Sequence, residues 1–230
     1  MTRIVHQKDT KVHLAVFDFD GTCISTDSPV MLVHRLAFGG HLKKTTISHI
    51  VNWSIRYKYR LPQDEASVRG FVFEAFEDVP IEDVWEYMYR FYEEKLVSTI
   101  RPKAQEQMRL HNEAGDTIVV VSASWEPIIV RAMDDFPFTH YITTVMEEKD
   151  GCYTSKVIGK PIEGASKVDA LKEYADKTFG CDNWVIEYAY GDHHSDRFIL
   201  NEAKHPFAVT PDNPLRRYAK KVGIPILDWR

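Results

Sequence analysis

Three runs of apolar residues divide the chain, and each has the length and the β-branched or aromatic content of a buried strand. They cover residues 12–19, 116–124 and 184–191. Polar residues or a glycine close each run and mark where a strand would end. Segments of helical character lie between the runs. The pattern therefore predicts an α/β protein whose core is a doubly wound parallel sheet with helices on both faces.

The segment between the first and second runs is far longer than one strand-to-strand crossover needs. Pro62, Pro80 and Pro102 punctuate it. Four stretches in it read as helices, at residues 29–39, 42–59, 63–76 and 81–97. We therefore expect a small helical cap domain at 29–102, inserted after the first strand, and a core formed by 1–28 and 103–230.

A smaller β element is expected after the second strand. The pair Asp150-Gly151 is typical of a two-residue hairpin turn. It predicts a hairpin whose strands lie at 141–146 and 152–158. No large domain is expected in this part of the chain.

Composition limits the classes of function. A chain of 230 residues with 44% hydrophobic content can bury one good core and a smaller lobe. The net charge of -5 and the pI near 6.1 argue against a nucleic-acid partner. The three cysteines are widely separated and lack paired spacing, which favours a reducing cytoplasm over a disulfide frame or a zinc site. No apolar signal core or segment of transmembrane length is found, so we expect a cytoplasmic protein without stable membrane insertion.

Two carboxylates follow the first predicted strand. Asp18 and Asp20 are two positions apart, so in extended geometry both project to one side at the carboxyl end of the strand. Open α/β sheets bind ligands at that end. Two like charges on one face repel and need either a compensating cation or a catalytic use. The alternative is an acidic strand-to-turn junction, because Asp and Gly are ordinary turn residues.

Three downstream features favour a catalytic use. The second strand runs into Ser122, Lys167 stands at the opening of an amphipathic helix, and the third strand ends at Asp192, with Asp196 four residues later. Each has an ordinary reading alone: a serine at a strand end, a lysine on a solvated face, and acids that cap the next helix. The ordered set of four motifs is much harder to explain in that way.

These four motifs, in this order, resemble the haloacid dehalogenase superfamily, in its phosphoserine-phosphatase-like branch (subfamily IB), from Val12 to Trp229. The resemblance implies a Rossmann-like core and a phosphatase that hydrolyses a small phosphomonoester through an aspartyl-phosphate. A carboxylate can attack phosphorus and split one hard displacement into two easier ones. By resemblance the catalytic residues are the nucleophile Asp18, the general acid and base Asp20, and the phosphoryl-binding Ser122 and Lys167. The cofactor would be Mg2+, with Asp18, the Asp20 backbone carbonyl and Asp192 as ligands and Asp196 nearby.

One departure from the family pattern follows Asp192. A small residue usually stands there, whereas this chain has His193 and then His194. An imidazole beside the metal would ligate it or favour softer divalent ions. We favour the simpler expectation that the histidine points outward.

Three residues are candidates for substrate binding. Thr22 would add a hydroxyl. Asp27 stands nine residues after the nucleophile, where phosphoserine phosphatases read the substrate's amine; an N-cap for the helix near Pro29 is the alternative. Arg69 is the candidate carboxylate reader, but the direct register puts Phe71 at that position, about half a helical turn away. We therefore expect an amine-bearing or uncharged phosphomonoester to be preferred to phosphoserine; phosphoserine phosphatase proper stays an alternative.

The second predicted cap helix mixes basic and aromatic residues, which are typical of membrane-surface helices or anionic-ligand surfaces. They are His41, Lys43, Lys44, Trp53, Arg56, Tyr57, Lys58, Tyr59 and Arg60. Because the overall charge is negative and the apolar face is modest, we favour a packed cap helix with solvated charged ends. A phosphatase fold used as an interaction module at a membrane or partner surface is the competing class of function.

Overall fold

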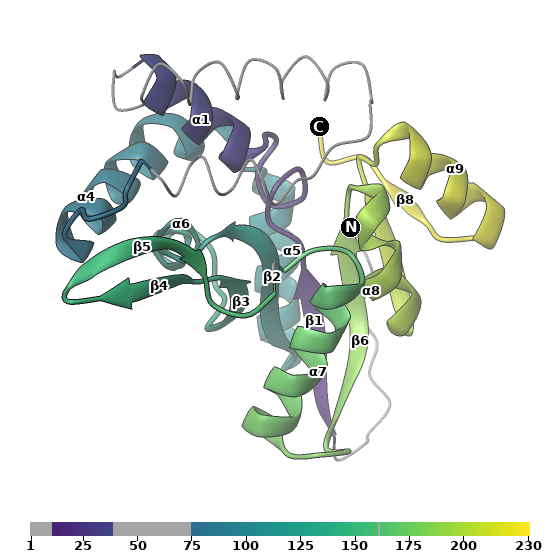
Figure 1. Ribbon diagram of the computed structural model, residues 1–230. Coiled ribbons are helices and arrows are strands. Elements are labelled where there is room, and N and C mark those ends of the chain that lie inside the picture. Colours follow the sequence, from purple (N-terminus) through teal and green to yellow (C-terminus); the bar gives the residue numbers. More distant parts are fainter. Residues whose placement is uncertain (1–10, 39–74, 161) are drawn as a thin grey trace.

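The computed structural model describes residues 11–38, 75–160 and 162–230 (Figure 1). Within these ranges the central sheet has six strands in the order β3-β2-β1-β6-β7-β8, and every neighbouring pair is parallel. The strands are β1 (Val12–Phe17), β2 (Thr117–Trp125), β3 (His140–Thr144), β6 (Trp184–Gly191), β7 (His205–Val209) and β8 (Ile226–Leu227). The strand order reverses between β1 and β6. This confirms the predicted α/β class and the doubly wound, Rossmann-like sheet.

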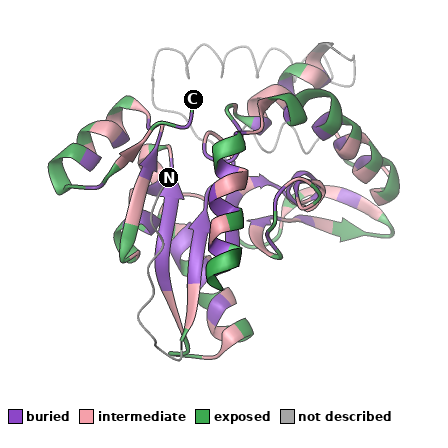
Figure 2. Cartoon of the chain, turned by 180° about the vertical axis from the view of Figure 1, so that it is seen from behind, coloured by how far each residue is buried: buried purple, intermediate pink, exposed green. Residues whose placement is uncertain are grey.

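Helices cover both faces of the sheet (Figures 1 and 2). Residues Ala15 and Phe17 of β1 join one hydrophobic cluster, and Leu14 and Val16 join the other. This alternation follows from the two-residue period of a strand. The first cluster includes side chains of α5 (Pro102–Ala114) and α6 (Glu126–Ala132), and the second those of α7 (Ala165–Phe179), α8 (Arg197–Glu202) and α9 (Asn213–Val222). Because side chains on both sides of β1 are buried, the position of this strand is fixed, and so is the place where Asp18 leaves it.

Two further helices belong to the long segment between β1 and β2. They are α1 (Ser28–Phe38) and α4 (Ile81–Phe91), and α4 continues into a π-helical turn (Tyr92–Leu96) and a 3-10 turn (Val97–Thr99). Both helices contribute to the hydrophobic cluster that contains Phe19. They confirm the helices predicted at 29–39 and 81–97. The domain boundaries at 28–29 and 102–103 stay a prediction.

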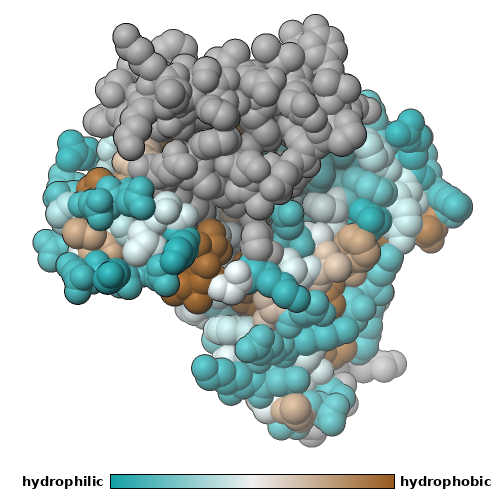
Figure 3. Space-filling view, in the orientation of Figure 1, coloured by the Kyte–Doolittle hydropathy of each residue, from teal (hydrophilic) through white to brown (hydrophobic). Residues whose placement is uncertain are grey.

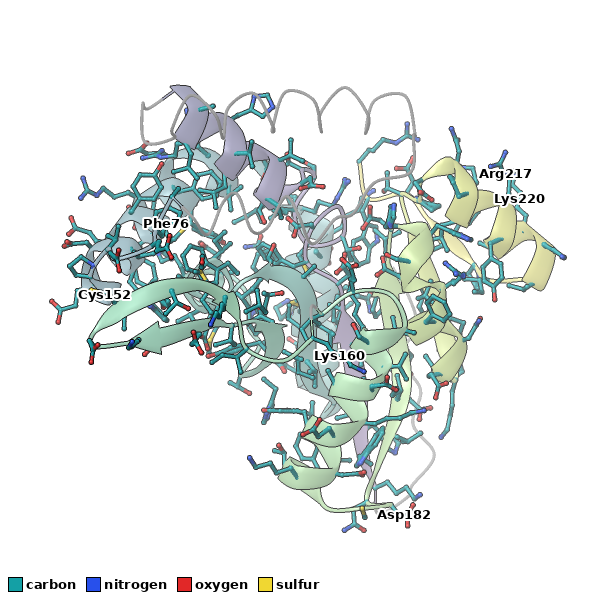
Figure 4. All side chains as sticks on the ribbon, in the orientation of Figure 1. Phe76, Cys152, Lys160, Asp182, Arg217 and Lys220 are labelled. Atoms are coloured by element: carbon teal, nitrogen blue, oxygen red, sulfur yellow. The ribbon has the colours of Figure 1, made fainter. Side chains whose placement is uncertain are left out.

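Several predictions fall outside the described residues. These are the helix at 42–59, the helix at 63–76 apart from its last two positions, Arg69, and the basic and aromatic segment at 41–60. The chain is described again from Ala75. Phe76 then packs against Tyr87 of α4 and Trp125 of β2, with ring centroids 5.6 and 5.3 Å apart (Figure 4). The described chain that begins at Ala75 therefore packs against the core from its second residue.

The predicted hairpin is right in its turn and wrong in its first strand. The antiparallel pair is β4 (Met146–Lys149) and β5 (Cys152–Val157). Asp150 and Gly151 both have positive φ, at 52° and 79°, as a type I′ turn requires. Residues 141–144 instead belong to β3, which pairs in parallel with β2. The pattern of residues along a strand predicts the strand but does not predict which strand pairs with it. The hairpin partner expected at 141–146 therefore differs from the observed one.

The surface of the described residues is mainly hydrophilic in the view of Figure 3. Large apolar side chains that remain exposed in this part of the chain lie far apart in the sequence: Val97, Ile158, Phe198 and Val222. None of the described helices combines the length and the hydropathy that crossing a membrane requires.

Candidate active site

The candidate site lies at the carboxyl ends of β1 and β6, where the strand order reverses. Phe17 at the end of β1 is in register with Tyr190 of β6, so the residues that follow the two strands are neighbours. A cavity of about 460 Å³ opens there. Its lining includes Asp18, Asp20, Lys167, Asp192, His193 and Asp196. Although β1 ends at Phe17, both predicted carboxylates reach the cavity.

Three carboxylates gather on one side of this cavity. Asp18, Asp192 and Asp196 each place an oxygen within 4.8 Å of the others. Burial raises the pKa of Asp18 to about 6, and Lys167 opposes this rise. Burial, together with the charges of Asp18 and Asp196, raises the pKa of Asp192 to about 9. Crowded carboxylates with raised pKa values are the electrostatic setting that a bound cation relieves, and oxygen ligands suit Mg2+. The residues present therefore fit a divalent metal ion.

Two glycines make room for these carboxylates. A Cβ on Gly21 would lie 2.1 Å from an Asp192 oxygen, and Gly21 also has a φ of +73°. A Cβ on Gly191 would lie 2.7 Å from Cβ of Asp196. Both distances are too short for any side chain, so the packing of the acids depends on glycine at both positions.

Lys167 supplies the positive charge inside the cluster. It is the third residue of α7 and is 4% exposed. Its Nζ donates to Oδ1 of Asp18 at 2.5 Å and to Oδ1 of Asp196 at 2.8 Å. Burial disfavours the ammonium, but these two carboxylates outweigh it and raise the pKa of Lys167 above its ordinary value. The lysine therefore remains charged and holds Asp18 and Asp196 in fixed orientations.

Asp20 lies in a different environment, among hydroxyl groups. The Ser124 hydroxyl donates to Oδ2 of Asp20, and the backbone N–H of Ser28 donates to Oδ1 at 2.6 Å. The hydroxyl oxygens of Ser28 and Ser124 are 2.6 Å apart. Burial, with a contribution from the charge of Asp27, raises the pKa of Asp20 to about 7. A carboxyl group with this pKa can both donate and accept a proton near neutral pH.

Sequence reasoning did not single out Ser28 or Ser124. The signal for Ser124 was present, because it lies two residues after Ser122 and so shares a side of the extended strand. Ser28 carried no comparable signal, since a serine at the start of a helix is ordinary. Only its contact with Asp20, eight residues earlier in the chain, distinguishes it.

The remaining predicted residues take other positions. Thr22 is fully buried and its hydroxyl donates to Oδ1 of Asp192 at 3.1 Å. Ser122 is 1% exposed and its hydroxyl accepts the backbone N–H of Ser124 at 3.0 Å. Asp27 lines the cavity, and its Oδ1 accepts the N–H of Val30 at 3.0 Å, which is an N-cap bond for α1.

Neither imidazole of the two histidines after Asp192 belongs to the three-carboxylate cluster, although the backbone N–H of His193 donates to Oδ2 of Asp196 at 3.0 Å. His193 lines the cavity with a mostly exposed side chain; its Nδ1 accepts the backbone N–H of Ser195 at 3.3 Å, and its Nε2 is 3.6 Å from Asp212. The ring of His194 packs edge-on against Tyr218, and burial lowers the pKa of His194. Nδ1 of His193 therefore caps the 3-10 turn at His194–Asp196.

Comparisons with known proteins bear on the family and the fold. The family model of haloacid dehalogenase-like hydrolases matches residues 15–200. A histidinol-phosphatase of Neisseria meningitidis is 28% identical over 95% of this chain and 99% of its own length. A Bordetella pertussis protein of unknown function has the same fold, with a TM-score of 0.85, 23% identity and coverage of 96% of this chain and 100% of that one.

The fold is also that of a phosphoserine phosphatase solved as an analogue of its phospho-aspartyl intermediate. That structure gives a TM-score of 0.62 at 18% identity and covers 96% of this chain and 94% of that one. The fold, the ordered motifs and the match of the family model over most of the chain lead to one conclusion. The chain belongs to the haloacid dehalogenase-like hydrolase family.

Proposed function

We propose that this protein is a Mg2+-dependent phosphatase that hydrolyses a small phosphomonoester through phosphorylated Asp18. The observation that carries the proposal is the contact of the buried Lys167 ammonium with both Asp18 and Asp196 in the cavity. A lysine held there offers fixed positive charge to a phosphoryl group, and the adjacent carboxylate offers a nucleophile.

The first half of the reaction would join Asp18 to phosphorus. An oxygen of Asp18 attacks as the bond to the leaving alkoxide breaks, and Lys167 stabilises the charge on the phosphoryl oxygens. Ser122 is the proposed hydroxyl donor to the same group. Mg2+, held by Asp18, the Asp20 carbonyl and Asp192 with Asp196 adjacent, would supply the charge that lets a phosphate dianion approach carboxylates.

Asp20 would act as general acid in the first half of the reaction and as general base in the second. As the alkoxide leaves, protonated Asp20 gives it a proton; Asp20 then takes a proton from the water that attacks the aspartyl-phosphate. Inorganic phosphate leaves and Asp18 is restored. The pKa of Asp20 near 7 supports both roles, and its bonds from Ser28 and Ser124 keep the carboxyl group oriented.

We further propose that the substrate carries an amino group. Asp27, Glu163 and Asp212 line the cavity beyond the catalytic residues, and a cation would balance their charge. The relative matched over nearly its full length is named a histidinol-phosphatase, which makes L-histidinol phosphate the first compound to test. The competing interaction-module function rests on residues 41–60, which lie outside the described residues.

The proposed partner is a small-molecule phosphomonoester, with no nucleic acid and no stable membrane insertion. We also propose a cytoplasmic location. The three cysteines are widely separated in the sequence and lack paired spacing, which favours a reducing compartment.

The test is a phosphate-release assay on L-histidinol phosphate, phosphoethanolamine, phosphoserine and a sugar phosphate, with and without Mg2+. We expect Mg2+-dependent turnover that is highest on an amine-bearing ester without a carboxylate. Asp18→Asn should remove nearly all turnover in a folded protein. Comparable turnover by Asp18→Asn would exclude the nucleophile assignment, and a preference for phosphoserine would restore phosphoserine phosphatase proper.

A matched variant tests the amine reader separately. Asp27→Ser keeps a good N-cap for α1 but removes the charge from the cavity. It should raise KM for amine-bearing esters and leave KM for p-nitrophenyl phosphate unchanged. Because Asp27 also raises the pKa of Asp20, kcat can change for both substrates, and equal effects on the two KM values are the result that would exclude Asp27 as the amine reader.

A further inference from the structure

Arg101 is a buried cation outside the catalytic motifs. It stands between the 3-10 turn at Val97–Thr99 and α5, where the chain returns to the sheet, and it is 8% exposed. Pro102 follows it and favours extended backbone, and Arg101 has φ -88° and ψ 111°. The local sequence therefore favours the backbone conformation in which Arg101 is found.

The side chain of Arg101 joins two segments that are distant in sequence. Its Nε donates to the carbonyl of Gly21 at 3.2 Å, and its Nη1 donates to the carbonyl of Trp229 at 3.1 Å. The backbone N–H of Arg101 also donates to the carbonyl of Cys23 at 2.9 Å. A planar guanidinium can serve two acceptors in fixed directions, which a lysine ammonium does less well.

The loop that Arg101 holds carries active-site residues. Gly21 directly follows Asp20, and its neighbour Thr22 donates to Asp192. Two more contacts fix the same loop: an isolated β-bridge between Ile24 and Ile100, and a bond from the N–H of Ser25 to Thr99 at 2.8 Å. The loop is thus bound along its length to the segment that ends at Arg101.

The Trp229 end of this connection is anchored near the site as well. The indole of Trp229 stacks on Tyr190, with centroids 5.7 Å apart, two residues before Asp192. The backbone N–H of Trp229 donates to the Thr210 hydroxyl at 3.0 Å. Burial lowers the pKa of Arg101, whereas the charge of Asp192 opposes this, so the guanidinium lies within the field of that carboxylate.

We infer that Arg101 is a positioning residue that fixes the Gly21–Ser25 loop, and through it Asp20 and Asp192, against the segment that contains Trp229. The inference rests on the proposed phosphatase function. Because the guanidinium bonds to backbone carbonyls, it fixes main-chain positions and does not compete with Lys167 for the catalytic carboxylates. A small shift of catalytic groups is enough to slow chemistry strongly without weakening substrate binding.

Lys103 offers a matched control. Its Nζ donates to the carbonyl of Asp228 at 2.7 Å, one residue before Trp229, and it is exposed. Lys103→Met therefore removes a contact with the same terminal segment but leaves the bond to Gly21 intact. Arg101→Met removes both bonds, and Arg101→Lys keeps the charge but lacks the planar fork.

The experiment measures two quantities on the full chain. Steady-state kinetics with p-nitrophenyl phosphate and L-histidinol phosphate gives kcat and KM at saturating Mg2+. Amide hydrogen exchange of the metal-free protein, read on a peptide that spans residues 20–26, reports the order of the loop without any activity. Thermal unfolding of each variant shows that assays are made on folded protein.

For Arg101→Met we expect kcat to fall by roughly 10²-fold with KM nearly unchanged, and exchange in the loop to rise selectively. Arg101→Lys should lie between Arg101→Met and the native protein, and Lys103→Met should match the native protein in both measurements. Should Arg101→Met fail to fold, Arg101→Lys carries the test. Native exchange in the loop of a folded Arg101 variant would overturn the inference, as would an equal loss in Lys103→Met. A native protein without phosphatase activity would refute the proposed function instead, and the exchange data would still decide the role of Arg101.

Discussion

At the scale of single residues, two carboxylates of the same loop have been given different environments. Asp18 accepts a hydrogen bond from the Lys167 ammonium, whereas Asp20 accepts from the Ser124 hydroxyl and the Ser28 backbone N–H. Burial raises the pKa of both, to about 6 for Asp18 and about 7 for Asp20. Lys167 counteracts the rise at Asp18, which suits a nucleophile that must be ionised. The group with the higher pKa is the better acid–base catalyst near neutral pH.

The first prediction concerns Asp20. Asp20→Asn should lower kcat by roughly 10²–10⁴-fold on alkyl phosphates, because the leaving alkoxide is no longer protonated. The loss should shrink for p-nitrophenyl phosphate, whose leaving group needs little protonation. Rates on the two kinds of ester measure the difference. An equal loss for good and poor leaving groups would contradict the assignment of Asp20.

The second prediction concerns Gly21. An alanine there meets backbone strain at φ +73° and a clash with Asp192. Gly223 has a φ of +83° and open space within 4 Å of the point where a Cβ would lie, so Gly223→Ala carries the strain alone, about 1–2 kcal/mol. Chemical denaturation and kinetics should show Gly21→Ala to be less stable than Gly223→Ala and nearly inactive. Equal behaviour of the two variants would rule out the clash with Asp192 as the reason for glycine.

At the scale of elements, side-chain contacts fix how the strands and helices meet. The hairpin of β4 and β5 is joined to α4 by a bond from Nε1 of Trp85 to the Tyr153 hydroxyl at 2.8 Å. At the outer edge of the sheet, Nδ1 of His140 in β3 lies 2.8 Å from the Tyr174 hydroxyl of α7. Neither contact touches the catalytic residues. The second contact holds α7, whose first turn carries Lys167.

The third prediction follows from His140. Burial lowers its pKa below the ordinary 6.5, so the folded protein binds this proton less readily than the unfolded chain does. The contribution of the neutral His140 ring to the free energy of unfolding is therefore present above pH 6.5 and is lost as the pH falls below that value. In urea unfolding at several pH values, His140→Gln should lose less stability on acidification than the native protein. Parallel pH profiles would contradict a depressed pKa at this position.

At the scale of the whole molecule, the fold stores negative charge at one end of its sheet. The pKa of Asp192 is raised further than that of Asp18, from 3.8 to about 9, by burial and by the charges of Asp18 and Asp196. Its contribution to folding is fully present below pH 3.8 and is lost as the pH rises towards 9. Near neutral pH without metal, Asp192 stays protonated in the folded state whereas the unfolded chain ionises freely, so this residue weakens the folded state.

The fourth prediction is that metal binding and Asp192 are coupled through stability. At a Mg2+ concentration of 100 times its Kd, the native protein should gain about 2.7 kcal/mol of unfolding free energy. Asp192→Asn should unfold at a higher temperature than the native protein in EDTA near neutral pH, and should gain little from Mg2+. Asp169→Asn, an exposed site on α7, is the charge-matched control. A full Mg2+ gain in Asp192→Asn would exclude Asp192 from the metal site.

The sequence by itself determined the fold class and the edge of the sheet where the candidate site lies. The apolar runs identified β1, β2 and β6; Asp18 and Asp192 directly follow β1 and β6 and line the cavity, whereas Ser122 lies within β2, three residues before its end. Carboxyl ends of neighbouring parallel strands meet at one edge, so motifs that follow such runs converge without further information. Lys167 was also predictable, because it opens a helix with a clear apolar face.

Only the tertiary structure decided which groups touch within that edge. The Ser124 contact with Asp20, the Thr22 contact with Asp192 and the bridge from Arg101 to Gly21 each join segments that lie far apart in the chain. The pairing of β3 with β2, rather than within a hairpin, belongs with them. Local periodicity records which side of an element is buried, but a hydrogen-bond partner depends on how separate elements are packed together. Packing is a property of the assembled core, so these contacts leave no repeating pattern in the sequence.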